Sequence, residues 1–156
     1  MAAWVSRVDE AAVRNTRDVN ILLRRADLDQ ARRALEAAGF IYRRVSSLGQ
    51  PGNLELFLDG PGASARDALH IVFASEKVRA DSPVASPDVL ESEAADAFRL
   101  VSLSALVKMK LAAFRDKDRT HLRDLIEVGL LDAARTAQLP TELAQRLETL
   151  LNTPEG

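Results

Sequence analysis

The 156-residue chain contains no cysteine, which excludes disulfides, thiol nucleophiles, zinc ribbons and iron–sulfur clusters. Histidine occurs only as His70 and His121, which argues against a zinc site built from histidines. No apolar run reaches the length of a membrane span, and the N-terminus lacks the basic-then-apolar layout of a signal peptide. We therefore expect a cytoplasmic protein without a membrane partner.

Aromatic residues make up only 4% of the chain, which argues against a base-stacking surface for single-stranded nucleic acid. The 21 basic and 23 acidic residues give a net charge of −2, so no overall field attracts nucleic acid. Lysine is rare, and 17 of the basic residues are arginine. Arginine suits bidentate contacts with phosphate and carboxylate, although a GC-rich coding sequence gives the same bias.

The length fits one domain with a core of its own, and 47% of the residues are hydrophobic. Alternating apolar residues predict strands over 18–23, 40–45, 54–58, 68–74 and 98–101. Apolar residues at helical spacing predict helices over 27–38, 102–115, 119–128 and 141–151, and residues 2–10 look like the end of another. Residues 80–97 indicate a surface segment with one short strand.

This order of elements predicts an α/β domain of the α+β kind, with a mixed sheet flanked by helices and a helical C-terminal region. We expect residues 1–101 to form the α/β core and residues 102–156 to form the helical part of the same domain.

Two polar residues, Asp18 and Asn20, stand two apart on the first predicted strand and therefore share one face of the sheet. Oxygen ligands at this spacing commonly hold a divalent cation such as Mg²⁺. A structural role, with Asp18 capping the start of the strand, is the alternative.

Glu55 lies on the face of its predicted strand opposite Leu54, Leu56 and Leu58. If this strand lies beside residues 18–23, Glu55 converges on Asp18. The alternative is an edge-strand charge that faces water.

Lys110 falls within the apolar stripe of the helix predicted over 102–115. A lysine on a core-facing stripe must either extend its ammonium to solvent or meet a buried anion. That anion is either a carboxylate or a nucleotide phosphate.

Three segments carry a resemblance to a known family, and they are TRDVNILLRRADLDQARRALEAAGF, NLELFLDG and VSLSALVKMKLAAFRDKDRTHLRDLIEVGLL. Through them the chain resembles the nucleotidyltransferase fold, the DNA polymerase beta-like superfamily. It is most similar to small bacterial stand-alone members related to abortive-infection toxins of toxin–antitoxin systems.

The resemblance implies a metal-dependent site. Asp18, Asn20 and Glu55 take the places of the three family acids, the first two as Mg²⁺ ligands and Glu55 as a further ligand and the base. Lys110, Arg119 and Arg123 take the places of cations near the nucleotide. The implied reaction transfers a nucleotidyl group from a nucleoside triphosphate (NTP) to a hydroxyl of a protein, an RNA or a small molecule.

Three departures from the family pattern bear on activity. Asn20 brings no negative charge, Glu55 is one methylene longer than aspartate, and the Gly-Gly or Gly-Ser turn of the family is missing before residue 18. We therefore expect weak or absent transfer, and the residues leave open whether the chain is an enzyme.

Two non-catalytic interpretations stand beside the transferase. One is a degenerate nucleotidyltransferase fold that binds a nucleotide or a partner. The other is an RNA-binding module that uses the arginine pairs at 24–25, 32–33 and 43–44.

An assembly is also expected, because the family's first strand, turn and helix look truncated here. An uncovered sheet edge favours pairing. We expect a homodimer or larger assembly, in which a second copy or the helix around Trp4 and Val5 covers that edge.

Overall fold

The computed structural model describes residues 2–11, 13, 19–46, 53–95 and 97–153. Its contacts divide the chain into two compact units, one over 16–91 and one that joins residues 1–15 to residues 92–156. We call them the sheet unit and the helical unit.

The sheet unit contains a four-stranded mixed sheet in the order β1-β4-β3-β2. The edge strand β1 (Val19–Leu23) runs parallel to β4 (Leu69–Phe73), and the other two neighbouring pairs are antiparallel. The remaining strands are β3 (Asn53–Leu58) and β2 (Ile41–Ser46), and a short 3₁₀ turn, η2 (Ala65–Asp67), precedes β4. The alternating apolar residues of all four strands fit this pleat.

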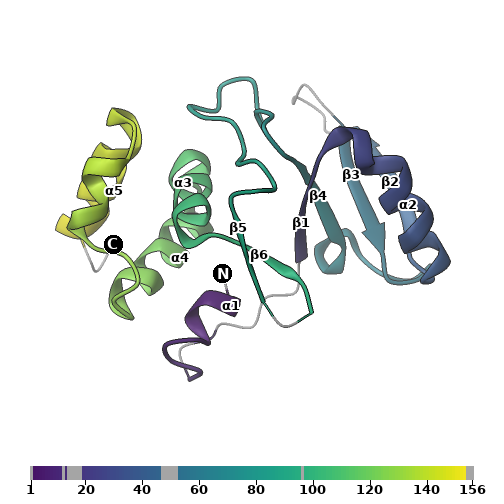
Figure 1. Cartoon of the computed structure of the whole chain (residues 1–156), viewed down its shortest axis with the longest axis horizontal. Coiled ribbons are helices and arrows are strands. Elements are labelled where there is room, and N and C mark those ends of the chain that lie inside the picture. Colours follow the sequence, from purple (N-terminus) through teal and green to yellow (C-terminus); the bar gives the residue numbers. More distant parts are fainter. Residues whose placement is uncertain (1, 12, 14–18, 47–52, 96, 154–156) are drawn as a thin grey trace. The chain divides into compact units, whose positions relative to one another are not determined.

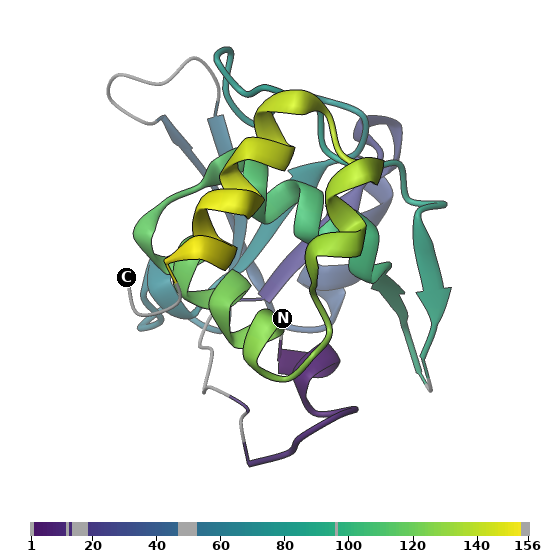
Figure 2. The same ribbon diagram turned by 90° about the vertical axis from the view of Figure 1, so that its left-hand side faces the viewer.

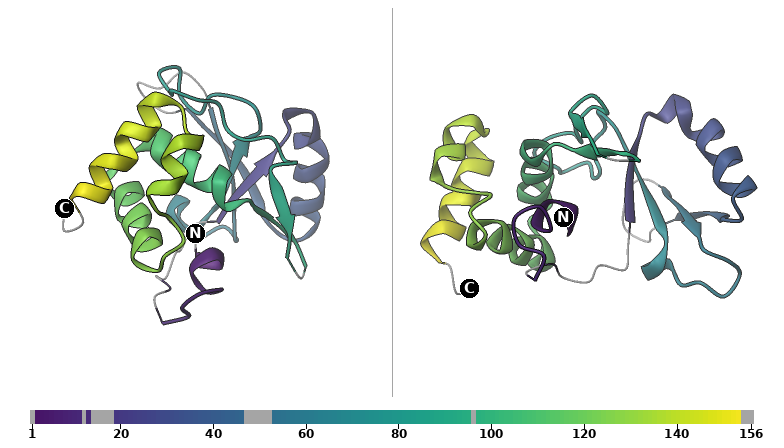
Figure 3. Two further views of the ribbon diagram at one scale, coloured as in Figure 1. Left: turned by 60° about the vertical axis from the view of Figure 1, so that its left-hand side comes forward. Right: turned by 60° about the horizontal axis from the view of Figure 1, so that its bottom comes forward.

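One helix, α2 (Leu28–Ala37), packs along one face of this sheet and follows the 3₁₀ turn η1 (Arg25–Asp27) (Figure 3). Gly39 ends it with a φ of +96°, a left-handed conformation that glycine adopts without strain. Asp27, the residue before the helix, makes no side-chain cap to it, because the preceding 3₁₀ turn occupies the position where an extended cap residue would stand.

The helical unit begins with the short helix α1 (Ala2–Val5) and continues with a hairpin of β5 (Ser92–Ala94) and β6 (Arg99–Val101). Three longer helices follow and pack against one another (Figure 2). They are α3 (Leu103–Ala113), α4 (Asp116–Glu127) and α5 (Thr141–Asn152), with the 3₁₀ segment η3 (Ala133–Gln138) before the last.

Leucines supply most of the core of the helical unit, and Leu111, Leu122 and Leu125 are fully buried. The Ser102 side chain caps α3 by accepting a hydrogen bond from the Ala105 amide at 3.3 Å. α1 joins this unit because Val5 is buried and the Trp4 indole donates to the Val101 carbonyl at 3.0 Å.

The expected α+β class with a helical C-terminus is confirmed, as are the four strands of the larger sheet and the three C-terminal helices. By their contacts, the β5–β6 hairpin and α1 group with the three C-terminal helices. Among the described residues, no helix has both the length and the hydropathy needed to span a bilayer.

Candidate functional site

The first predicted site residues lie on β1, and the strand beside it is β4. Asn20 is exposed and pairs with His70 in the parallel register, so both side chains project from the same face. The His70 Nε2 donates to the Ala65 carbonyl at 2.9 Å. Asp18 lies outside the described residues.

Glu55 occupies a different environment, on the other face of the sheet. The register pairs Asn20 with His70 and His70 with Leu56, which places these three on one face and Glu55, the neighbour of Leu56, on the opposite face. The strand of Glu55 does not lie beside β1, so the expected convergence of Glu55 on the first predicted strand is wrong for Asn20. β4 separates the two strands, a pairing that alternation within each strand does not reveal.

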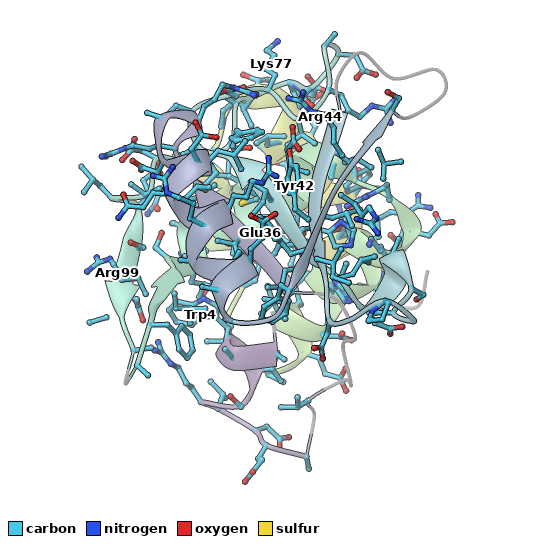
Figure 4. All side chains as sticks on the ribbon, turned by 90° about the vertical axis from the view of Figure 1, so that its right-hand side faces the viewer. Trp4, Glu36, Tyr42, Arg44, Lys77 and Arg99 are labelled. Carbon is cyan, nitrogen blue, oxygen red and sulfur yellow. The ribbon has the colours of Figure 1, made fainter. Side chains whose placement is uncertain are left out.

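The Glu55 carboxylate is only 2% exposed and is engaged on both oxygens. It accepts a hydrogen bond from the Tyr42 hydroxyl and one from the Arg44 Nε at 2.9 Å. Tyr42 and Arg44 project from the same side of β2 (Figure 4). The hydrogen bond to Glu55, together with burial, raises the pKa of Tyr42. Glu55 on β3 therefore links that strand to β2 through these two hydrogen bonds, and the contacts argue against a role as general base.

Asn20 and Glu55, the two described positions, do not lie where one magnesium ion could reach both. Mg²⁺ prefers an octahedron of oxygen ligands, whereas the face of Asn20 brings an imidazole from the neighbouring strand. The described residues contain no group of three or more histidine, aspartate or glutamate side chains placed to hold a metal.

The helical unit contains a denser polar cluster around Asp118, which we call the Asp118 cluster. The Asp118 carboxylate is 1% exposed and receives Lys110 Nζ at 2.9 Å and Arg115 Nε at 2.7 Å. The Lys110 ammonium also lies 3.1 Å from His121 Nδ1. The prediction that Lys110 points inward to a buried acid is confirmed, and the acid is Asp118.

Electrostatics fix the charges of this cluster. Burial alone raises the pKa of Asp118, but the hydrogen bonds from Arg115 and Lys110 outweigh it and hold the pKa below its usual value. Burial and the Lys110 charge lower the pKa of His121 below 6.5. At neutral pH the Asp118 side chain is therefore a carboxylate and the His121 imidazole is neutral. The His121 Nδ1 accepts a hydrogen bond from the Lys110 ammonium, and Arg115 is the second cation of the cluster.

The other two predicted cations lie on α4 beside different partners. Arg119 pairs with Asp116 and lies over the Phe114 ring at 5.8 Å. Arg123 Nε donates to the Thr153 carbonyl at 3.3 Å. Neither contacts Lys110 in the part of the chain that the structure describes, so only Lys110 belongs to the Asp118 cluster.

Sequence reasoning missed three members of the cluster, Arg115, Asp118 and His121. Their spacing of three residues along α4 places them on one face of the helix, as helical neighbours. The sequence feature that could have indicated the cluster is the run of charged residues after Phe114. In the structure Phe114 has a left-handed backbone, α3 ends there, and α4 turns back toward Lys110.

The arginine pairs do not form an anion-binding patch in the described residues. In each pair at least one arginine contacts a neighbouring group, and four of the six arginines form an ion pair with a carboxylate. The ion pairs are Arg24–Asp88 at 3.1 Å, Arg25–Glu76 at 2.6 Å, Arg32–Glu36 at 3.1 Å and Arg44–Glu55 at 2.9 Å. These contacts leave little uncompensated charge for RNA.

Comparison with protein-family models and with curated proteins finds no match to this chain. The resemblance to nucleotidyltransferases therefore stays a prediction from the three sequence segments.

Proposed function

We propose that the chain is a cytoplasmic, nucleotidyltransferase-like protein that binds an NTP without transferring its nucleotidyl group. The observation that carries this proposal is the separation of Asn20 and Glu55 onto opposite faces of the sheet. Metal-assisted transfer needs its carboxylates on one face, within reach of the same ions. Both Glu55 oxygens already accept a hydrogen bond, one from the Tyr42 hydroxyl and one from Arg44, and the side chain is buried away from a substrate hydroxyl.

The Asp118 cluster supports nucleotide binding as the retained activity. Two cations share one carboxylate, so the cluster has an excess positive charge. The Arg115 side chain is largely exposed, and Arg123 has no carboxylate partner among the described residues. An excess of cations on a helical surface attracts the phosphates of a nucleotide.

Calorimetric titration with ATP, GTP, CTP and UTP tests this proposal, each with Mg²⁺ and with EDTA. We expect one NTP to bind both with Mg²⁺ and with EDTA. The phosphates would contact the protein's own cations, so a metal held by the protein is not needed. Lys110→Met should weaken that binding about tenfold, the usual effect of losing one charge-assisted contact. Lys77→Met is the matched control, since Lys77 is an exposed lysine of the sheet unit.

Two results would change the proposal. Binding that requires Mg²⁺ and is lost in Glu55→Gln would restore the metal-dependent transferase. Failure of all four nucleotides to bind would exclude the nucleotide as ligand and favour the degenerate fold that binds a protein partner, such as an antitoxin.

A further inference from the structure

A small cavity lies within the helical unit between α3 and η3. Its volume is about 40 Å³, and it is lined by Ser104, Val107, Lys108, Arg135, Gln138 and Leu139. None of the residues of the Asp118 cluster lines it, so it is a separate feature.

Helix geometry brings the polar groups of this cavity together. Ser104 lies in the first turn of α3 and Lys108 four residues later, so both are on one face of the helix. η3 places Arg135 opposite them, and its Nη1 donates to the Ser104 hydroxyl oxygen at 3.2 Å. The Asp132 side chain caps the start of η3 by accepting from the Ala134 amide at 3.0 Å, which fixes the turn that carries Arg135.

The charge of this cavity is unbalanced. No carboxylate lines it, and within the described part of the chain neither Lys108 nor Arg135 forms an ion pair. Among the described residues, most arginines that form a polar contact have a carboxylate partner. Lys108 and Arg135 differ from them because neither has one in that part of the chain. Both side chains are half-buried, and holding two like charges around a small space costs free energy unless an anion offsets them.

We propose that this cavity binds a small oxyanion, with phosphate the best fit. The guanidinium of Arg135 offers a planar pair of donors to two oxygens, Lys108 adds a point charge, and Gln138 adds an amide. A cavity of about 40 Å³ exceeds the roughly 10–15 Å³ that one water needs on the same measure, so it has room for a single compact group. The ligand is either free phosphate or the phosphate end of a larger molecule.

Titration of the full chain with inorganic phosphate tests the proposal, with binding followed by calorimetry and by the melting temperature. Ionic strength is held constant with chloride. We expect saturable binding in the wild type, weakened about tenfold in Arg135→Gln and several-fold in Lys108→Gln. Lys117→Gln, which removes an exposed lysine of α4 outside the cavity, should bind phosphate as the wild type does.

The variants should fold, because neither removed cation has an ion pair in the described chain, and circular dichroism in chloride checks this. Lys108→Gln tests the site even if Arg135→Gln is unstable, since the Lys108 side chain forms no ion pair within the described residues. A second titration with glycerol 3-phosphate distinguishes the two possible ligands. Tighter binding than that of inorganic phosphate identifies the ligand as a phosphate monoester, and weaker binding identifies it as free phosphate. Absence of saturable binding, or equal binding in wild type and both cavity variants, would overturn the proposal.

Discussion

At the scale of single residues, the buried carboxylates decide what the chain can do. Glu55 and Asp118 are equally buried, yet Glu55 links two strands whereas Asp118 gathers two cations from two helices. The sequence showed that Lys110 sits on an apolar stripe, so that its ammonium must either reach solvent or meet a buried anion. It did not show which acid, because the partner comes from the next helix and depends on how α3 ends.

Asp118→Asn should destabilise the protein strongly. The substitution leaves Lys110, with a side chain only 18% exposed, beside a neutral amide, and we expect a loss of about 2–3 kcal/mol in the free energy of unfolding. Asp116→Asn is the matched control on the same helix, because Asp116 is almost fully exposed and its pair with Arg119 should contribute below about 1 kcal/mol. Urea denaturation measures both, and equal losses would contradict a structural role for the Asp118 cluster.

His121 should make stability depend on pH. Its pKa in the folded chain is below the usual 6.5, so the unfolded chain binds the proton more readily. The stabilising contribution is therefore fully present above about pH 6.5 and is lost as the pH falls through the lower folded value.

The free energy of unfolding, measured by denaturant titration between pH 7.5 and 5, should fall for the wild type and fall less for His121→Gln. His70→Gln, which removes the other histidine, serves as the control and should keep the wild-type slope. Identical slopes in all three proteins would refute this assignment.

The Ser86 hydroxyl is a second buried polar group, and no partner for it is found among the described residues. Ser86→Ala removes an unsatisfied hydroxyl, so we expect stability to be unchanged or higher by up to about 1 kcal/mol. Ser102→Ala removes the cap of α3 and should instead cost about 1 kcal/mol. A loss of similar size in both variants, measured by thermal unfolding, would show that Ser86 has a stabilising contact.

At the scale of elements, local pattern predicted most of the strands and helices but not their pairing. Alternation gave β1, β2, β3 and β4 within a residue or two, since each has one apolar face. The strand order depends on contacts between distant segments, and so the insertion of β4 between β1 and β3 was not visible. η3 was missed as well, because AARTAQ lacks apolar periodicity.

The β1–β4 register leads to a prediction about metal binding. Asn20→Asp combined with His70→Asp would place two carboxylates side by side on one face of adjacent strands, about 5 Å apart, and should create Mn²⁺ or Mg²⁺ binding. Asn20→Asp with Glu55→Gln should bind metal no differently from Asn20→Asp alone, because Glu55 lies on the other face.

Calorimetry with MnCl₂ compares these variants. Weaker binding on addition of Glu55→Gln would mean that Glu55 reaches the metal and that the register argument fails.

At the scale of the whole molecule, the order of the predicted strands and helices indicated an α+β chain with a helical end, and the structure has this class. The sequence did not reveal that the helical unit is discontinuous. Its first segment is tied to β6 by the Trp4 indole and to β5 by the ion pair of Arg7 with Glu93, contacts between residues about 90 positions apart. The expected homodimer stays a prediction, and sedimentation at micromolar concentration checks it.

The central claim is that this fold does not perform metal-dependent nucleotidyl transfer. The most direct measurement incubates the wild-type protein with Mg²⁺, each α-³²P-labelled NTP and both protein and RNA acceptors, and compares label transfer with the same reaction in EDTA. The account predicts no transfer above the EDTA background for any nucleotide, because Asn20 and Glu55 face opposite sides of the sheet. Mg²⁺-dependent labelling that disappears in Glu55→Gln would contradict it.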